Sequence, residues 1–458
     1  MYYPLDLLAE ACGQKPDQLL YLFCMIQGFA ACLILGQIDN IKLRKLWSTT
    51  SGLAIGFYFY GINYILNIGY VLVNYLLMAC FERQLASTLM TFWTGIMLLF
   101  VTFSHLWISE NSQDLEIDII FLMNSCKFHM MAVNYSNAEK LADPEKSKEM
   151  TTRERYYAEP LRKRAGLMDF VHFYFFCGAS WTGMCHEYRD FDDFINRKDD
   201  YANIPKDKLF MQFFIRFFHW VGCLITMIIL LSLVDYEYLL TDEWANSPFW
   251  FRLVYLIGTS FLKVYTYFVG FVAMECFFIA CGQGYKPEKK LPDGTVQPEN
   301  FNTIRQIEAM AILTQDSWLK AVNGWNIQIH LWLKYYVMLR LMDRKKAKGS
   351  MQIGPMVITF TVSALWHGLR VGFLVMFTGF AMMEIICKYG GRTKFAHWVV
   401  KNVPYVIYHP IRWFCQYSVA AYLVIAFQLS LVSQFNFIHY HLYYFFHWAL
   451  PLTIFLVT

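Results

Sequence analysis

The sequence predicts an all-α, polytopic integral membrane protein with roughly 9–11 transmembrane or re-entrant helices. Hydrophobic residues make up 57% of the 458 residues and charged residues only 16%. Soluble domains, in contrast, average about 25% charged residues. The charges gather in short blocks between long apolar runs, which is the pattern of loops between membrane-crossing helices. The formal net charge of +4 is too small to indicate binding of nucleic acid.

The first apolar runs predict how the chain enters the membrane. Residues 1–18 predict a short amphipathic helix on the membrane surface, and residues 19–35 predict the first span. The basic block Lys42–Lys45 follows, and the preference of basic residues for the cytosolic side places it in the cytosol. The next run, 53–80, exceeds the ~20 residues that cross a bilayer, so we expect one tilted helix or a break near Gly61.

Further spans and one long polar segment complete the predicted organisation. Additional spans are expected at 86–108, 209–234, 249–281, 411–432 and 443–457. Residues 138–165 are rich in charge and predict a polar loop in water. The run 354–387 would measure about 50 Å as one helix, against about 30 Å of hydrocarbon, so it must tilt or break near His367. Because no internal repeat is visible, we expect a single domain, 1–458.

Residues 323–388 place two polar side chains among aromatic and aliphatic neighbours. Asn326 follows Trp325, and His367 lies within the apolar run 354–387. An ionisable group at membrane depth costs a few kcal/mol and therefore indicates function by default. An asparagine amide left unpaired in an apolar site costs about 1–3 kcal/mol. In the alternative interpretation, both side chains only form hydrogen bonds that hold neighbouring helices together.

A family signature is visible in this region. Trp325-Asn326, followed by Trp366-His367-Gly368, resembles the asparagine and histidine signature of the membrane-bound O-acyltransferases. Other segments resemble the lysophospholipid acyltransferase branch of that family: 8–19, 131–137, 167–195 with Glu187-Tyr188 and Asp190-Phe191, and the residues Glu308, Trp318 and Asn323. The resemblance therefore extends over nearly the whole chain, and it implies the fold of that family.

The resemblance also implies a reaction. A long acyl chain would move from acyl-coenzyme A to the free hydroxyl of a lysophospholipid, in a multi-pass protein of the endoplasmic reticulum. His367 is expected to act as the general base, because the ordinary pKa of histidine, about 6.5, suits that task. Asn326 is expected to polarise the thioester carbonyl with its amide. Acyl-coenzyme A is a co-substrate, and no tightly bound cofactor is expected.

Additional residues are candidates for binding the substrates. Trp325 and Trp366 would line an acyl tunnel, or alternatively they are ordinary core residues. A basic block could contact the phosphates of coenzyme A, or alternatively it only sets topology; it contains Arg344, Lys345 and Lys346. No metal site is expected, because His186-Glu187 begins like a zinc-binding HExxH motif but lacks the second histidine.

Two alternative functions stay open on the sequence alone. The first is a protein or sterol O-acyltransferase of the same superfamily. The second belongs to another class, a multispanning transporter or channel, in which the polar residues inside spans would line an ion path. The sequence does not indicate the lipid head group, the acyl-chain preference or the oligomeric state.

Overall fold

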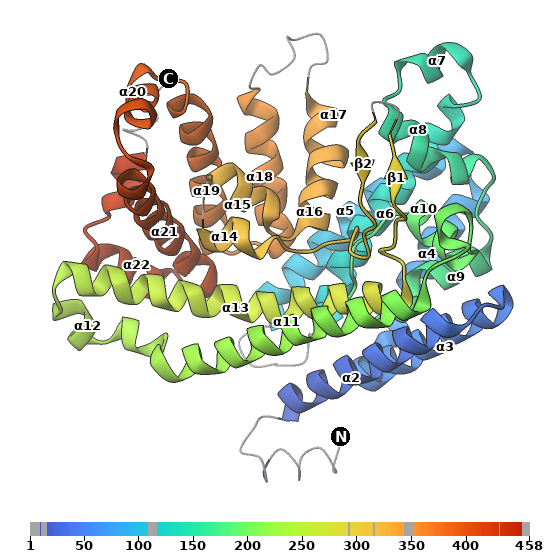
Figure 1. Ribbon diagram of the computed structural model, residues 1–458, viewed down its shortest axis with the longest axis horizontal. Helices are drawn as coiled ribbons and strands as arrows, with labels where there is room; N and C mark the ends of the chain where they lie inside the picture. The colour runs from blue at the N-terminus through green and yellow to red at the C-terminus, as the bar shows by residue number, and fades with distance from the viewer. Residues whose placement is uncertain are drawn as a thin grey trace. The chain divides into compact units, whose positions relative to one another are not determined.

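The computed structural model describes residues 10, 16–108, 117–291, 294–314, 317–342, 352–429 and 431–450. These residues are almost wholly helical, with one two-stranded sheet (Figure 1), which confirms the predicted all-α class. The chain divides into two compact units. The first comprises Met1–Val101, Ile108–His219 and Val272–Arg305; the second comprises Thr102–Trp107, Trp220–Phe271 and Gln306–Thr458, each taken over its described residues. The single domain 1–458 stays a prediction.

The first unit contains the N-terminal helices and the sheet. Its elements are α2 (Pro16–Gln37), α3 (Ile41–Tyr60), η1 (Gly61–Asn63), α4 (Tyr64–Cys80), α5 (Arg83–Ile108), α6 (Ile117–Lys140), α7 (Pro144–Glu149), α8 (Thr152–Ala158), η2 (Glu159–Arg162), α9 (Leu167–Tyr174), α10 (Tyr188–Ile195), η3 (Asp199–Tyr201), β1 (Lys289–Lys290) and β2 (Val296–Gln297). The strands pair antiparallel. Helix α11 (Lys206–Leu233) begins in this unit, and α13 (Phe249–Cys281) ends in it.

The second unit holds the C-terminal half of the chain. Its elements are η4 (Glu237–Leu240), α12 (Asp242–Asn246), α14 (Ala309–Thr314), α15 (Trp318–Gly324), α16 (Ile327–Trp332), η5 (Leu333–Met338), α17 (Leu339–Leu341), α18 (Ile353–His367), α19 (Val371–Gly390), α20 (Lys394–Asn402), α21 (Tyr405–Leu429) and α22 (Val432–His441). Segment η5 is a π-helix, which has a wider turn than the α-helices on either side of it.

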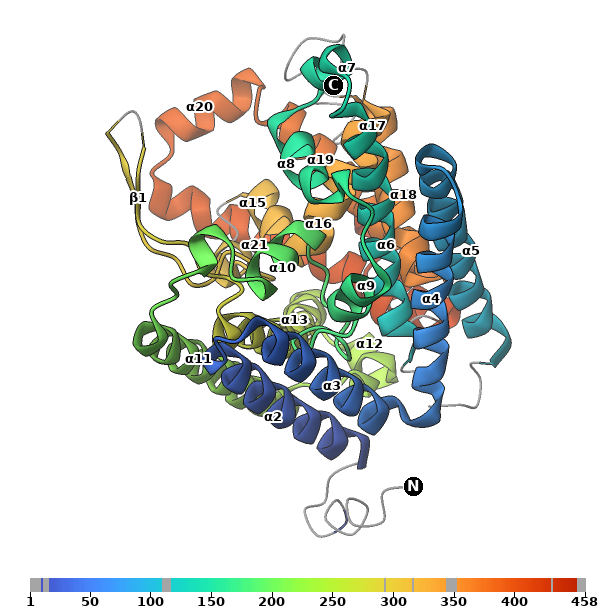
Figure 2. The same ribbon diagram turned by 90° about the vertical axis from the view of Figure 1, so that its right-hand side faces the viewer.

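Helices α2 and α3 lie side by side in the first unit (Figure 2), and an arginine joins them. The side chain of Arg44 is buried, and its Nη1 donates to the carbonyls of Leu35 at 2.8 Å and Ile38 at 3.0 Å. Its guanidinium also lies over the ring of Phe194, 4.5 Å from the centroid. The basic block Lys42–Lys45 is therefore only partly a surface charge, because Arg44 is part of the packing between the two helices.

Both of the long apolar runs break where a glycine adopts a positive φ. Helix α3 ends before Gly61, whose φ is +59°, and α4 begins after one short 3₁₀ turn. Helix α18 ends before Gly368, whose φ is +122°, and α19 begins three residues later. Glycine adopts such angles without the steric cost that a Cβ imposes. For each run the sequence left a tilted helix or a break as alternatives, and the structure has the break.

The polar segment 138–165 contains short helices that the sequence analysis did not predict, and its place as a polar loop in water stays a prediction. Asp143 caps α7, with its side chain accepting the backbone N–H groups of Glu145 and Lys146. Thr151 and Glu154 form a reciprocal capping box at the start of α8. Such caps satisfy the unpaired N–H groups of a first helical turn, which explains why so polar a segment forms short helices.

Helices α19 and α21 pack closely in the second unit. A Cβ added at Gly372 would lie 1.9 Å from the carbonyl oxygen of Ala426, and one added at Gly379 would lie 2.4 Å from the side chain of Leu423. Glycines of this kind let helix backbones approach each other, as is typical of helix pairs in membranes. The same two helices contribute Met376, Tyr422 and many of their neighbours to one hydrophobic cluster.

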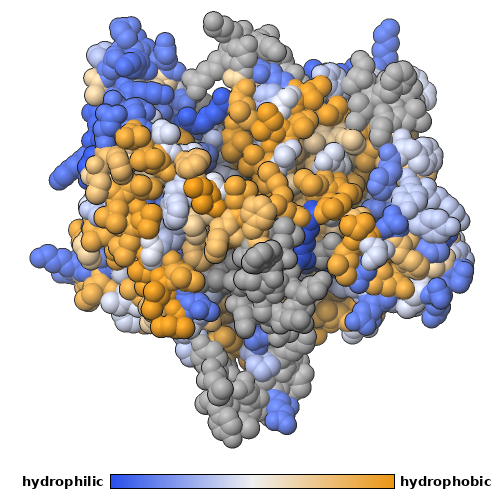
Figure 3. All heavy atoms as spheres, turned by 180° about the vertical axis from the view of Figure 1, so that it is seen from behind, coloured by the Kyte–Doolittle hydropathy of each residue, from blue (hydrophilic) through white to orange (hydrophobic). Residues whose placement is uncertain are grey.

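Six described helical segments are long and apolar enough to cross a membrane. They cover Leu19–Gln37, Ile41–Cys80, Arg83–Val101, Lys206–Leu240, Phe249–Cys281 and Val371–Gly390. Apolar side chains cover much of the face drawn in Figure 3, which suits contact with lipid rather than with water. The predicted amphipathic segment 1–18 lies largely outside the described residues.

Candidate active site

Asn326 occupies a strained turn between α15 and α16. Its φ and ψ are +43° and +57°, the left-handed conformation, which asparagine tolerates better than most residues. Backbone hydrogen bonds to residues 306 and 308 hold this turn on both sides of Asn326. The N–H of Ile327 donates to the carbonyl of Gln306 at 2.8 Å, and the N–H of Glu308 donates to the carbonyl of Gly324 at 2.8 Å. These two hydrogen bonds hold the turn in which Asn326 adopts the left-handed conformation.

The side chain of Asn326 is left for another partner. It does not cap α16, and among the described residues its amide forms no hydrogen bond. The amide is half-buried rather than fully enclosed. As far as the described residues go, the amide of Asn326 is thus free to meet a ligand. Its role in the reaction stays a prediction.

Trp325 packs on the helix α13 side of this turn. Its half-buried ring lies edge-on to Tyr267 and Phe271, with centroid distances of 5.4 Å and 5.7 Å. These contacts anchor the residue before Asn326. A role for Trp325 in an acyl tunnel stays a prediction, and so does the same role for Trp366, which is buried beside His367.

His367 is the last residue of α18, and its imidazole lies in a cage of aromatic rings. The ring stacks on Phe377, with centroids 5.2 Å apart and planes 23° from parallel. Phe427 meets it edge-on at 5.1 Å, and Phe373 and Trp366 complete the cage at 6.0 Å and 4.8 Å. The imidazole forms no hydrogen bond with any described residue. Its ring nitrogens are therefore not used for helix contacts within that part of the chain.

Asn326 and His367 lie at the same end of one helix pair. The helix formed by α16, η5 and α17 begins directly after Asn326, and α18, of 15 residues, runs back beside η5 in the opposite direction (Figure 1). At 1.5 Å per residue α18 is about 22 Å long, close to the length of its partner. Asn326 directly precedes the first helix, and His367 ends the second, so both belong to the same end of the helix pair.

The aromatic cage includes residues that the sequence analysis missed. Phe373 and Phe377 lie six and ten positions after His367 and one helical turn apart on α19, so helical spacing could have placed them on one face. Phe427 lies 60 positions further along the chain, on α21, and no local pattern connects it with His367. Of the predicted substrate-binding residues, Arg344, Lys345 and Lys346 lie outside the described residues.

The Glu187-Tyr188 segment forms its own polar network in the first unit. Glu187 is buried and accepts hydrogen bonds from Asn134 Nδ2 and Arg153 Nη2, both at 3.1 Å. Two segments singled out in the sequence, 131–137 and 167–195, therefore meet through the pair formed by Asn134 and Glu187. The salt bridge with Arg153 compensates the buried carboxylate.

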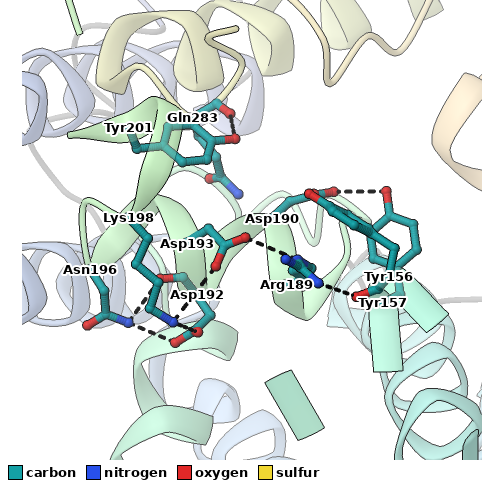
Figure 4. Close-up of polar contacts among 10 residues, drawn as sticks. All are labelled: Tyr156, Tyr157, Arg189, Asp190, Asp192, Asp193, Asn196, Lys198, Tyr201 and Gln283. Atoms are coloured by element: carbon teal, nitrogen blue, oxygen red, sulfur yellow. Dashed lines mark hydrogen bonds and ion pairs between the residues drawn. The ribbon is translucent and has the colours of Figure 1, made fainter. Parts of the chain in front are cut away.

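Helix α10 extends this network (Figure 4). Arg189 donates from Nε to Asp193 at 3.2 Å and from Nη1 to the carbonyl of Tyr156 at 2.6 Å. Tyr157 donates its hydroxyl to Asp190 at 3.5 Å. Burial raises the pKa of the Asp190 carboxyl to about 6, although nearby cations act in the opposite direction. Asp190 is thus a carboxyl whose charge changes within the range of ordinary buffers.

This pKa predicts how stability depends on pH. Because the pKa is raised in the folded protein, folding favours the protonated carboxyl. The stabilisation is present below the unfolded pKa of about 3.9 and is lost as the pH rises through about 6. We expect the melting temperature of the detergent-solubilised protein to fall, relative to that of Asp190→Asn, between about pH 4.5 and pH 7, because the Asp190 carboxyl loses its proton in this interval. Asp200→Asn, at an exposed position, serves as the control, and parallel curves for all three proteins would contradict the prediction.

No group of three or more His, Cys, Asp or Glu side chains in the described part of the chain is arranged to hold a metal ion. The side chains described at the candidate site are an amide, an imidazole and aromatic rings. Such a set can accept a proton and donate a hydrogen bond to a carbonyl oxygen, and both steps are needed for acyl transfer.

Comparison with known proteins decides the family. The model of the membrane-bound O-acyltransferase family matches residues 76–389, a range that contains both Asn326 and His367. The chain belongs to the membrane-bound O-acyltransferase family. The resemblance seen in the sequence is thereby confirmed, and the protein is an acyltransferase with multiple membrane-spanning helices.

Relatives within the family span several kingdoms. A Schizosaccharomyces pombe protein named lysophospholipid acyltransferase is 25% identical over 402 residues, covering 85% of this chain and 75% of the relative. Human lysophospholipid acyltransferase 5 is 21% identical, covering 91% and 85%. Lysophospholipid acyltransferase 2 of Arabidopsis thaliana is 23% identical, covering 82% and 79%. The membrane-bound O-acyltransferase relatives thus align with most of the chain.

Proposed function

We propose that this membrane-bound O-acyltransferase transfers a long acyl chain from acyl-coenzyme A to the free hydroxyl of a lysophospholipid. The observation that carries the proposal is the placement of His367 and Asn326. Both lie at one end of a single helix pair, and neither side chain forms a hydrogen bond among the described residues. The names of the relatives supply the substrate class.

The proposed reaction uses the two residues in sequence. A ring nitrogen of His367 takes the proton from the lysophospholipid hydroxyl, and the oxygen attacks the carbonyl carbon of the thioester. The amide of Asn326 donates to the carbonyl oxygen as negative charge develops on it. The carbon–sulfur bond then breaks, and the imidazolium returns its proton to the departing thiolate. The products are a phospholipid ester and free coenzyme A, with atoms and charge conserved.

The aromatic cage assists the base by holding its ring. Stacking on Phe377 and edge contact with Phe427 restrict the orientation of the imidazole. A fixed ring costs less entropy to align with the hydroxyl than a mobile one. The apolar walls also keep water from competing with the hydroxyl for the thioester.

The alternatives named for the sequence are less well supported. Membership of an acyltransferase family supports an enzyme rather than a transporter or channel. The relatives are named for lysophospholipids rather than for proteins or sterols. We place the protein in the endoplasmic reticulum on the same basis. Localisation of a tagged full-length chain beside a marker of that membrane tests this assignment.

Release of free thiol tests the reaction. Purified protein in lipid nanodiscs, given acyl-coenzyme A and a panel of lysophospholipids, should release coenzyme A thiol in step with formation of the diacyl product. The matched control is the same lysophospholipid with its free hydroxyl replaced by a methyl ether. Thiol release that is equal with both acceptors would indicate hydrolysis and contradict transfer, and absence of release with every head group would contradict the proposed substrate class.

A further inference from the structure

A cavity lies between helices α19 and α21 of the second unit, apart from the His367 cage. Its volume is about 310 Å³, and its lining is mostly aliphatic and aromatic. Leu374, Thr378 and Met382 line it from α19, and Leu423 lines it from α21. A cavity of this size is at the lower end of the range for small-molecule sites, which is about 300–1,000 Å³. Apolar cavities of such dimensions bind apolar molecules rather than water.

One end of the cavity carries a polar pair. The hydroxyl of Tyr422 forms a hydrogen bond with Nδ1 of His447, and both residues are part of the lining. His439 holds Tyr422 in place. Its Nε2 donates to the Tyr422 carbonyl at 2.9 Å, and its ring stacks on the Tyr422 ring with centroids 3.9 Å apart. The cavity therefore combines an apolar lining with a polar pair that can form a hydrogen bond to an oxygen atom of a ligand.

The surroundings of the cavity identify the class of ligand. Helix α19 coincides with a candidate membrane span, and Val371 and Leu374 expose 51% and 39% of their surface on it. The solvent next to such a helix is the hydrocarbon of the bilayer. We propose that the cavity is a lipid site, which holds one hydrocarbon chain of a bilayer phospholipid with an ester oxygen at the pair formed by Tyr422 and His447.

This lipid would be distinct from the reacting substrates. Successive residues of a helix point about 100° apart, so Phe377, which stacks on His367, and Thr378, which lines the cavity, lie on different faces of α19. On α21, Leu423 lines the cavity, and Phe427, one turn later, belongs to the cage. A lipid in the cavity would thus contact the two helices that carry the cage without entering it. The proposal does not depend on acyl transfer.

Photocrosslinking in nanodiscs tests the site. A phospholipid with a diazirine on its acyl chain should label peptides of α19 and of residues 442–450, mapped by mass spectrometry. Thr378 is an exposed residue of the lining, so Thr378→Trp places a large ring in the cavity. This variant should lower the labelling about tenfold, the equivalent of about 1.4 kcal/mol in binding. Val371→Trp, two turns earlier on α19 and outside the lining, should label like the wild type.

Three further arms give decisive outcomes. His367→Ala should label normally, so failure of the proposed function would leave this result unaffected. Loss of labelling on addition of lysophospholipid or acyl-coenzyme A would show a substrate site and overturn the proposal, as would undiminished labelling of Thr378→Trp. His447→Phe should weaken labelling by the phospholipid probe but not by a diazirine alkane; an equal effect on both probes would overturn the assignment of the polar end.

Discussion

His367→Ala should reduce acyl transfer by about 10²–10⁴-fold, the usual contribution of a general base. Without the imidazole, the lysophospholipid hydroxyl keeps its proton, and its oxygen is a poor nucleophile. The loss should appear in kcat, measured by thiol release and by mass spectrometry of the diacyl product. Expression and membrane insertion should stay close to those of the wild type, because the described part of the chain makes no hydrogen bond to this ring.

Two companion variants separate chemistry from packing. His367→Phe keeps an aromatic ring between Phe377 and Phe427 but has no nitrogen, so it should be as inactive as His367→Ala. His397→Ala removes an exposed imidazole from α20 and should leave the rate unchanged. A rate for His367→Ala above about a tenth of the wild-type rate would exclude His367 as the base.

Removal of the Asn326 amide should lower kcat by about 10²–10³-fold, as is typical for loss of a donor to a developing oxyanion. The left-handed conformation of this residue decides which variant is informative. Asn326→Gly deletes the amide and tolerates a φ of +43°, so its melting temperature should match that of the wild type. Asn326→Ala deletes the same amide but adds strain of about 1–2 kcal/mol, so it should melt earlier.

Comparison of the two Asn326 variants distinguishes catalysis from structure. If the amide polarises the carbonyl, both variants lose kcat to a similar extent although only Ala lowers the melting temperature. Binding of acyl-coenzyme A, measured by calorimetry, should persist in both. If Asn326→Gly instead turns over at the wild-type rate, the residue matters only for its backbone, and the proposed reaction would depend on His367 alone.

The sequence predicted those features of the fold that depend on local physical signals. The breaks at Gly61 and Gly368 followed from runs too long for one crossing and from residues that adopt positive φ. The helices within 138–165 also had local signals, Asp143-Pro144 and the Thr151 to Glu154 capping box, but the high charge of the segment outweighed them in the prediction.

Other features depend on contacts between distant segments and had no local signal. The composition of the block Lys42–Lys45 indicated surface charge, whereas Arg44 is buried because carbonyls at the end of α2 accept its hydrogen bonds. The identities of Asn326 and His367 were visible in the sequence. The left-handed turn at Asn326 and the contact of Phe427 with His367 were not, because they arise from the packing of α15, α19 and α21.

The π-helical turn η5 makes the spacing along the chain part of the site. A π turn contains one more residue than an α turn over a similar rise, so η5 has the form of a one-residue insertion in a continuous helix. Deleting any single residue of Leu333–Met338 would let the segment close into an ordinary α-helix. The π turn absorbs its extra residue locally, so the helix before it and the helix after it would keep nearly the same orientation. Loss of a residue from α16, which is ordinary α-helix, would instead rotate Asn326 by about 100° relative to η5, the segment that packs beside α18. The position of Asn326 therefore depends on the number of residues in α16, whereas η5 can lose a residue without turning Asn326 away from the end of α18.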